Sequence, residues 1–536
     1  MFPIIVRGNT QGVKPVPLAG TPRFPSLFWT VCRKPKAMSQ ELIANSRPIS
    51  RYIPIVHTLV RQHLRFFLGI TLAGVALRLF FFFHFPAITN DSRIYADLAT
   101  NWLQHGVYGE TQLDQIVPTD ARLPGYPAFL AAIFALFGAG NFKAVLLVQI
   151  FLDLMTCLLI ADLARRTVSE RAARIAFALA CLCPFLANYS AAALTETLEI
   201  FFTVLALDLA AMGLDALDPD SPVRASWTAW AGSGAAVAAC ILLRPDGGIL
   251  LASMGAYLLV LLGKRIRANR SLVLVLIAGI VFSLFALAPL IPWTIRNFRT
   301  LSHFQPLAPR YATEQDELVP RGFNRWVKTW IADYTSVEEF YWSVPGNNLD
   351  PSKLPDRAFD SSEEQDKTLA LIADYNQSQQ ITPDLDARFG DLAAERIRAH
   401  PARYYTVLPA LRIADMWLRP RAEILPPDPR WWEFDDEVSS SILAVALGLV
   451  NLAFIGAACL ALLRGRSQVR YLGLLLIFVV LRSAFLGTLE NPESRYTLEC
   501  YPAVVLLAAA FLSDCCSRQK LQNSIEPSSR FRDNQP

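Results

Sequence analysis

The residues of this sequence best suited to chemistry are carboxylates and guanidinium groups at the ends of its apolar runs. A carboxylate can accept a proton from an attacking hydroxyl or help to hold a metal ion. A guanidinium can bind a phosphate through its planar set of N–H donors. The groups at such positions are Asp91, Asp120, Arg122, Glu196, Arg244, Asp246, Arg296, Glu493 and Arg495. They come from distant parts of the chain, so a fold that gathers them would create a site.

Asp91 and Arg122 are the two candidates with the most specific surroundings. Asp91 follows an apolar run in Asn-Asp-Ser, where it serves either as a base or as the N-cap of the next helix. Arg122 precedes Leu-Pro-Gly-Tyr-Pro, a rigid turn that opens another apolar helix. Arg122 is placed either to bind a phosphate or to anchor the chain among lipid headgroups.

The other candidates lie in short polar motifs beside apolar runs. Each motif, taken alone, is equally typical of anchoring at a membrane interface. Arg296 ends Pro-Trp-Thr-Ile-Arg, and Arg495 begins the last apolar run. The remaining candidates are Asp120, Tyr126, Glu196, Arg244, Asp246, Glu493 and Tyr496.

Several classes of function leave no trace in the sequence. No Gly-rich phosphate loop ends in Lys-Ser or Lys-Thr, so an ATPase is not indicated. The six histidines are dispersed and no His-Glu-x-x-His occurs, so a histidine metal site is not expected. The net charge of +4 is small for 536 residues and gives no electrostatic case for nucleic acid.

The composition predicts that these residues are positioned by transmembrane helices. Hydrophobic residues make up 53% of the chain and charged residues 18%, whereas soluble domains average roughly 45–50% and about 25%. A spanning helix needs about 20 mostly apolar residues. The sequence contains ten such runs, at residues 64–86, 142–163, 175–192, 194–212, 227–243, 247–262, 271–292, 441–463, 471–489 and 501–513.

One further apolar segment, residues 127–138, is too short to span and suits an interfacial or re-entrant helix. With this assignment the Arg-rich short connections all fall on the cytoplasmic side, together with the nearly neutral connection 213–226. These connections carry Arg165, Arg166, Arg171, Arg174, Lys264, Arg265, Arg267, Arg270, Arg464, Arg466 and Arg470. The candidate site residues then share the outer face, unlike the midplane position expected in a transporter.

The predicted fold class is an all-α polytopic membrane protein with a mainly helical outer domain. Residues 1–60 are expected to form a disordered basic cytoplasmic tail, in which Met38 is an alternative start. Helical spacing is predicted at 363–375 and 384–400, and a membrane-surface helix at 401–418. The other predicted parts are a transmembrane module 61–296 with a first outer loop 87–141, an outer domain 297–439, C-terminal spans 440–513 and a cytoplasmic tail 514–536.

The order of these motifs resembles the GT-C glycosyltransferases, of the protein O-mannosyltransferase and lipid A aminoarabinose transferase type. The nearest likeness is to bacterial relatives that modify lipopolysaccharide core, and it covers roughly residues 64–513. Each motif is weak alone, whereas their order along one topology is more specific. The motifs are Asp91 with Tyr95, Gly106-Val-Tyr108, Arg122-Leu-Pro-Gly-Tyr-Pro127, Arg165-Arg166, Thr195-Glu196, Leu243-Arg-Pro245, Pro292-Trp-Thr-Ile-Arg-Asn297, Ile397-Arg-Ala-His-Pro401 and Glu493-Ser-Arg-Tyr496.

The resemblance implies inverting transfer of a sugar from a polyprenyl-phosphate donor to a lipid, glycan or protein hydroxyl at the outer face. It implies that Asp91 is the catalytic base or orients it, and that Arg122, Arg296 or Arg495 binds the donor phosphate. It also implies a bacterial inner membrane protein with both termini in the cytoplasm. Ser92 stands where many relatives have Glu, so use of a divalent metal is left open. The alternative function is a transporter or flippase of a lipid-linked sugar.

Overall fold

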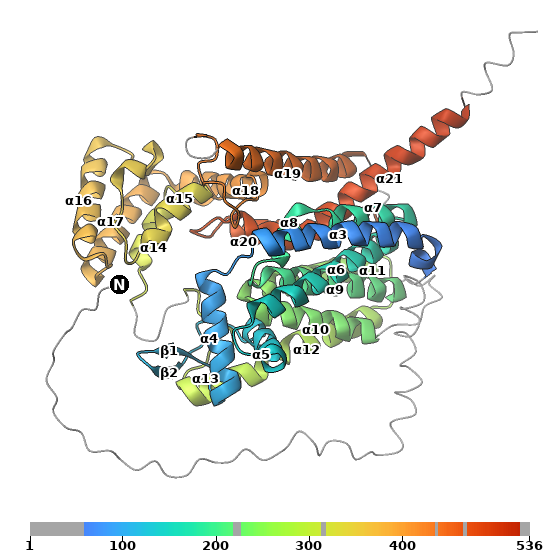
Figure 1. Cartoon of the computed structure of the whole chain (residues 1–536), viewed down its shortest axis with the longest axis horizontal. Helices are drawn as coiled ribbons and strands as arrows, with labels where there is room; N and C mark the ends of the chain where they lie inside the picture. The colour runs from blue at the N-terminus through green and yellow to red at the C-terminus, as the bar shows by residue number, and fades with distance from the viewer. Residues whose placement is uncertain (1–57, 218–226, 312–317, 435–437, 465–468, 526–536) are drawn as a thin grey trace, which may run out of the picture. The chain divides into compact units, whose positions relative to one another are not determined.

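The chain folds as a helical, multi-pass membrane protein, which confirms the predicted fold class (Figure 1). The computed structural model describes residues 58–217, 227–311, 318–434, 438–464 and 469–525. The predicted basic tail up to residue 57, Met38 and residues 526–536 lie outside these ranges. The helices of the first half are α3 (Leu64–His84), α4 (Asn90–His105), α5 (Gly125–Phe137), α6 (Phe142–Thr167), α7 (Glu170–Cys181), α8 (Pro184–Ser190), α9 (Glu196–Leu217), α10 (Trp227–Leu243), α11 (Gly248–Arg267), α12 (Val273–Leu287) and α13 (Leu290–Leu301).

The second half begins with a polar segment, residues 318–399, which is followed by one helix and then by three further apolar helices. The helices of this half are α14 (Arg321–Val327), α15 (Tyr334–Glu339), α16 (Ser362–Ser378), α17 (Pro383–Ala399), α18 (Leu408–Leu418), α19 (Val438–Arg464), α20 (Leu472–Leu486) and α21 (Tyr501–Ile525). The helices predicted at 363–375 and 384–400 are therefore confirmed as α16 and α17.

Seven helices of the described chain are long and apolar enough to cross a membrane, compared with about ten predicted spans. The pair α7 and α8, which bends by 52° between the two helices, meets the same criteria when taken together and forms either an eighth, broken span or a re-entrant loop. Two further predicted spans form α10 and α20, with 17 and 15 residues. These two are shorter than the roughly 20 residues that a straight crossing needs.

The first predicted outer loop contains more structure than its sequence indicated. The short apolar segment forms α5, a 13-residue helix. Before it, strands β1 (Gly109–Gln112) and β2 (Gln115–Pro118) pair as an antiparallel hairpin that the sequence analysis did not predict. Asp97 of α4 accepts hydrogen bonds from the backbone N and the hydroxyl of Thr111, at 2.7 and 2.8 Å, and so holds the hairpin against α4.

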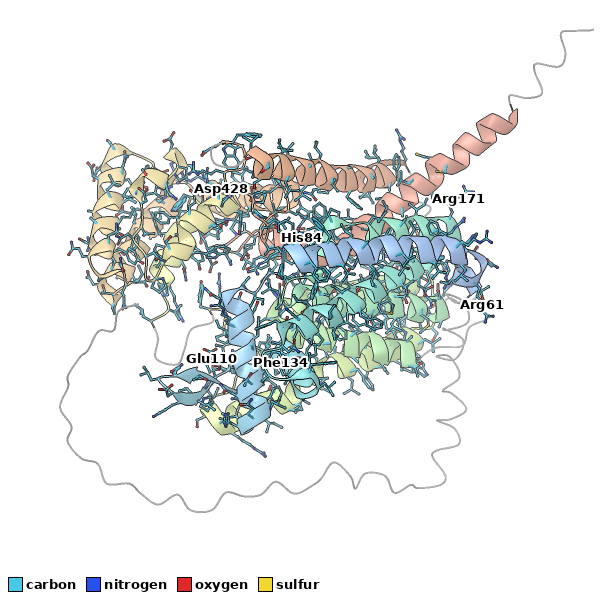
Figure 2. All side chains as sticks on the ribbon, viewed as in Figure 1. Arg61, His84, Glu110, Phe134, Arg171 and Asp428 are labelled. Atoms are coloured by element: carbon cyan, nitrogen blue, oxygen red, sulfur yellow. The ribbon has the colours of Figure 1, made fainter. Side chains whose placement is uncertain are left out.

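The connections predicted to share the cytoplasmic face meet at one end of the bundle. The backbone N of Arg470 donates to the carbonyl of Thr167 at 2.8 Å, and its side chain pairs with Asp215 at 2.9 Å. Arg265 donates to the carbonyl of Leu217. Figure 2 places Arg61 and Arg171 at this end and His84, at the other end of α3, away from it.

A buried ion pair joins α3 to α6. Arg78 Nε donates to Asp153 Oδ2 at 2.6 Å, and both residues are buried. Arg78 also donates to the carbonyls of Gly74 and Cys181, at 2.9 and 2.7 Å. An unpaired charge at this depth costs about 2.5–3.5 kcal/mol in insertion, so each charge needs the other.

The polar segment after α13 has an apolar core of its own. Side chains from α14, α15, α16 and α17 form one cluster around Trp326, Trp330, Tyr375 and Phe389. The predicted surface helix 401–418 consists of a π-helical turn, Arg403–Val407, followed by α18. Arg412 of α18 is buried and donates to the carbonyls of Ile331 and Lys328 at 2.8 and 2.6 Å, which joins α18 to the residues that follow α14.

Candidate active site

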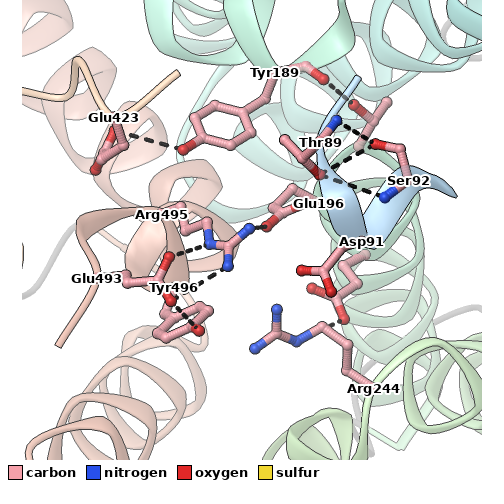
Figure 3. A network of polar contacts seen from close by, with 12 residues as sticks. Thr89, Asp91, Ser92, Tyr189, Glu196, Arg244, Glu423, Glu493, Arg495 and Tyr496 are labelled. Atoms are coloured by element: carbon pink, nitrogen blue, oxygen red, sulfur yellow. Dashed lines mark hydrogen bonds and ion pairs between the residues drawn. The ribbon is translucent and has the colours of Figure 1, made fainter. Parts of the chain in front are cut away.

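Asp91 lies in the first turn of α4, and it is not the helix cap. Thr89 is the N-cap, and its side chain forms a reciprocal capping box with Ser92 (Figure 3). The alternative interpretation of Asp91 as a capping residue is therefore wrong. Its side chain is 38% exposed, and its carboxylate is available for an interaction outside the helix.

The partner of Asp91 is Arg122, which reaches it from the turn before α5. Arg122 Nη2 donates to Asp91 Oδ1 at 3.0 Å. Tyr108 donates from its hydroxyl to the Arg122 carbonyl at 3.0 Å and fixes the backbone of the turn. A Cβ on Gly125 would lie 2.6 Å from the carbonyl oxygen of Leu242, so only glycine lets α5 approach α10 this closely. The Pro-Gly turn thus positions Arg122 against α4.

Tyr95 and Tyr126 form the floor beneath this pair. Their rings meet edge to face with centroids 5.1 Å apart, and both residues are buried. Tyr126 donates to Gln149 at 2.8 Å, which makes it part of the packing rather than of an open surface. Burial raises the pKa of Tyr95 to about 12, so this hydroxyl stays protonated at neutral pH.

A second charged group comes from α9 and from the start of the last span. Arg495 Nε pairs with Glu493 at 2.5 Å, and Arg495 Nη1 lies 3.6 Å from Glu196. Glu493 also accepts the hydroxyl of Tyr496. Both carboxylate oxygens of Glu196 are buried without a hydrogen-bond donor among the described residues. Figure 3 draws this group in one close view with Asp91 and Arg244.

Arg244 links these charges to a third group. Its Nε lies 3.5 Å from Glu199 and 3.2 Å from Asp246, and its guanidinium stacks on the ring of Tyr496 at 4.7 Å. Asp246 also pairs with Arg482 of α20 at 3.0 Å, and Arg482 pairs with Glu499. The segments around α9, α10, α20 and α21 are therefore joined by a continuous run of alternating charges.

A cavity of about 600 Å³ lies beside this charged region. Arg244, Tyr496 and Glu490 line one wall, and residues of the polar segment, including Phe323 and Tyr341, line the other. The polar segment thus covers the same end of the bundle as Asp91.

Arg296 and Asp120 are held in another set of contacts. Arg296 donates to the carbonyl of Thr119 at 2.8 Å and to the carbonyl of Tyr108, so its guanidinium holds the hairpin loop to α13. Asp120 bonds to His303 Nε2 at 2.8 Å. Within the described part of the chain, neither side chain forms a hydrogen bond or ion pair with Asp91 or Arg122, so both belong to a different set of contacts.

Four residues of the charged region were missed from the sequence: Glu199, Arg482, Glu499 and Glu423. Arg482 interrupts an apolar run, and an intramembrane charge is itself a signal of function or pairing. Glu199 lies three residues after Glu196, on the same face of a helix. Glu423 had no such signal, since its contact with the hydroxyl of Tyr189, at 3.5 Å, joins residues far apart in the chain.

Within the described ranges no three or more His, Cys, Asp or Glu side chains are grouped so as to hold a metal ion. Asp91 Oδ1 accepts a hydrogen bond from the guanidinium of Arg122, and Glu493 pairs with the guanidinium of Arg495. The donor set at the site therefore consists of carboxylates paired with arginines.

Comparison with known proteins finds one family model that matches part of the chain. Residues 120–295 match the model of the dolichyl-phosphate-mannose-protein mannosyltransferase family. The matched segment begins at the turn that carries Arg122 and ends in α13, so it includes Glu196, Arg244 and Asp246. Among curated protein sequences, none matches the chain.

Solved structures with similar folds are distant in sequence. The oligosaccharyltransferase AglB from Archaeoglobus fulgidus, in complex with an inhibitory peptide and a dolichol-phosphate, is 12% identical with a TM-score of 0.48; the match covers 89% of this chain and 53% of AglB. ArnT from Cupriavidus metallidurans bound to undecaprenyl phosphate is 16% identical with a TM-score of 0.36; the match covers 84% of this chain and 79% of ArnT. The apo state of the same protein is 17% identical. This chain thus spans about half the length of AglB.

Proposed function

We propose that this chain, a GT-C glycosyltransferase as its family match indicates, transfers a sugar from a polyprenyl-phosphate donor to a hydroxyl acceptor. The observation that carries the proposal is the pair of Asp91 and Arg122, 3.0 Å apart and partly exposed at one end of the helical bundle. A proton acceptor and a phosphate-binding group are the two parts that such a transfer needs.

The proposed reaction breaks one bond and forms another at the anomeric carbon of the donor sugar. The acceptor oxygen attacks this carbon and its proton passes to the carboxylate of Asp91. The bond from the carbon to the phosphate oxygen breaks, and polyprenyl phosphate leaves with the negative charge. Attack opposite the leaving group inverts the anomeric configuration.

Arg122 stabilises the leaving phosphate in this proposal. Its guanidinium has five N–H donors. Nη2 donates to Asp91 at 3.0 Å and Nη1 donates to the Ala121 carbonyl at 3.4 Å, so the other N–H groups are available to a phosphate. A phosphate that draws Arg122 away from Asp91 also removes the positive partner of that carboxylate. Donor binding would therefore free the carboxylate of Asp91 to face the acceptor hydroxyl.

The remaining charged residues are assigned to binding and positioning. The two carboxylate oxygens of Glu196 accept no hydrogen bond from the described residues, and we assign them to sugar hydroxyls of the donor. Arg495 offsets the negative charge of Glu196. Arg244 faces the cavity that the polar segment covers, and we assign this cavity to the acceptor. Arg296 positions the hairpin loop and so supports Arg122 indirectly. No step is assigned to a metal ion.

We further propose that this end of the bundle is the outer face of a bacterial inner membrane and that both termini are cytoplasmic. The Arg-rich connections at the opposite end support this orientation. The donor lipid then reaches the site from the membrane, and the acceptor reaches it from outside.

Asp91→Asn tests the assignment with purified protein and a panel of polyprenyl-phosphate sugars. Transfer should fall by about 10²–10⁴, because loss of a general base costs that much. The variant should still insert and fold, since Thr89 caps α4. A partly exposed ion pair is worth only about 0–1 kcal/mol. Donor binding should persist because Arg122 remains.

Asp114→Asn is the matched control. Asp114 is an exposed residue at the tip of the hairpin, at a positive φ of 63° that Asn tolerates. The control should transfer sugar at the normal rate. Near-normal turnover of Asp91→Asn would remove Asp91 from the mechanism. Movement of the lipid-linked sugar across vesicles without a new glycosidic bond would instead favour the transporter alternative.

A further inference from the structure

A second polar cavity lies at the other end of the bundle, where the Arg-rich connections meet. Its volume is about 470 Å³, and four cationic side chains line it: Lys264, Arg265, Arg270 and Arg470. Leu214 and Leu217 of α9 form part of its wall. Glu196 begins the same helix, so the cavity lies about 30 Å from the candidate active site at a rise of 1.5 Å per residue. The proposed transfer reaction makes no use of it.

Two of the four cations are held by the protein itself. Arg265 donates to the carbonyls of Leu217 and Ser271, which ties α11 to the end of α9. Arg470 pairs with Asp215 at 2.9 Å, and Asp215 also accepts the hydroxyl of Tyr471 at 2.6 Å. These contacts shape the cavity and fix two of its positive charges.

The other two cations have no such partner. The side chains of Lys264 and Arg270 form no hydrogen bond or ion pair with another residue of the described chain, and both residues are exposed. Among the described residues, Asp215 is the acid that contacts this group, and Arg470 pairs with it. The described lining of the cavity therefore carries an excess of positive charge.

We propose that this cavity binds the phosphate headgroup of an anionic phospholipid from the leaflet on the Arg-rich side. Basic pockets between transmembrane helices on that side are suited to acidic lipid headgroups. Lys264 and Arg270 contact the phosphate oxygens, while Tyr471 and Arg470 border the headgroup.

The apolar part of the wall favours a lipid over a free anion. Leu214, Leu217 and Leu261 line the cavity, and a free phosphate would leave them without a partner. On the outside of α11, Leu259 and Ile266 are 69% and 60% exposed, as expected of a helix that faces acyl chains. A phospholipid satisfies both the charged and the apolar surface.

The experiment compares lipid binding by the purified full-length protein and a double variant, Lys264→Gln with Arg270→Gln. Binding of phosphatidylglycerol, measured by native mass spectrometry as the lipid is titrated, should weaken roughly thirtyfold after loss of two cations. Arg267→Gln with Arg464→Gln is the matched control, because both residues are exposed cations at the same end that do not line the cavity. The control should bind as the unchanged protein does.

Two further arms make the result decisive. A charge-preserving variant, Lys264→Arg with Arg270→Lys, should bind normally, which separates loss of charge from loss of fold. Glycerol phosphate should bind much more weakly than phosphatidylglycerol. Equal lipid binding by the double variant and its control would overturn the proposal, as would glycerol phosphate binding as tightly as the lipid. Since the readout is lipid binding, failure of this proposal is distinct from failure of the proposed transfer.

Discussion

The three arginines predicted to bind phosphate differ in how many of their donors the protein already uses. Two guanidinium nitrogens of Arg296 donate to backbone carbonyls, and Arg495 lies between two carboxylates. Arg122 makes one contact with Asp91 and one with its neighbouring carbonyl. The sequence places all three at the ends of apolar runs and could not separate them, because the contacts that distinguish them join residues up to 299 positions apart.

Arg122→Lys tests the phosphate assignment at the scale of one residue. Lysine keeps the charge but loses the planar set of donors, so the apparent affinity for the donor should fall. A lost hydrogen bond to a charged group costs about 1.5–3 kcal/mol, or roughly 10–150-fold in kcat/KM. Transfer kinetics at varied donor concentration measure the change.

Arg93→Lys is the control, because Arg93 is exposed on the same helix as Asp91. Arg296→Lys should act differently, by lowering the melting temperature, since one ammonium group cannot replace the two nitrogens that bond separate carbonyls. Normal transfer by Arg122→Lys would overturn the assignment of Arg122 to the donor phosphate.

At the scale of elements, the long helices were predictable and the hairpin was not. Long apolar runs identify spanning helices by composition alone. The hairpin turns through Leu113 and Asp114, with φ of 45° and 63°, where Asn-Gly or Asp-Gly is the usual signal. Without glycine in the turn, its strands were not recognised. The contacts of the hairpin with α4 could be found only from the structure.

Gly125→Ala tests whether the close approach of α5 to α10 positions Arg122. The added carbon would meet the Leu242 carbonyl at 2.6 Å, so α5 must move outward. Overpacking typically costs about 1–3 kcal/mol, and a displacement of about 1 Å at a catalytic group can cost roughly 10²-fold in rate. Thermal unfolding and sugar transfer should both decline.

Gly255→Ala provides the comparison, because no atom lies within 4 Å of the carbon added there. This variant should unfold at the same temperature or slightly higher, since alanine favours helix. If Gly125→Ala behaved like Gly255→Ala, the turn before α5 would not depend on that contact.

At the scale of the whole molecule, the two ends of the helical bundle differ in the charged residues that they carry. The Arg-rich connections meet at one end, and the candidate site and the polar segment lie at the other. The sequence predicted this separation because Arg-rich short connections alternate along the chain with the segments that carry the candidate site residues. It could not predict how the polar segment docks, since Arg412 reaches buried backbone carbonyls rather than solvent.

Cysteine accessibility in intact cells measures the orientation. Arg267→Cys should react with a membrane-impermeant maleimide only after the cells are permeabilised, and Ser362→Cys should react without that step. Both positions are exposed, so burial does not limit either reaction. Labelling of Arg267→Cys in intact cells would reverse the orientation and remove the outer-face site.

The ion pair between Arg78 and Asp153 also constrains how the chain is made. The two residues are 75 positions apart. At about 5–20 residues per second, synthesis therefore exposes Arg78 for roughly 4–15 s before its partner exists. During that interval α3 carries an unneutralised charge, and it gains by remaining beside the insertion machinery until α6 emerges. We therefore expect release of α3 into lipid to follow the arrival of α6, a helix that is not its neighbour in sequence.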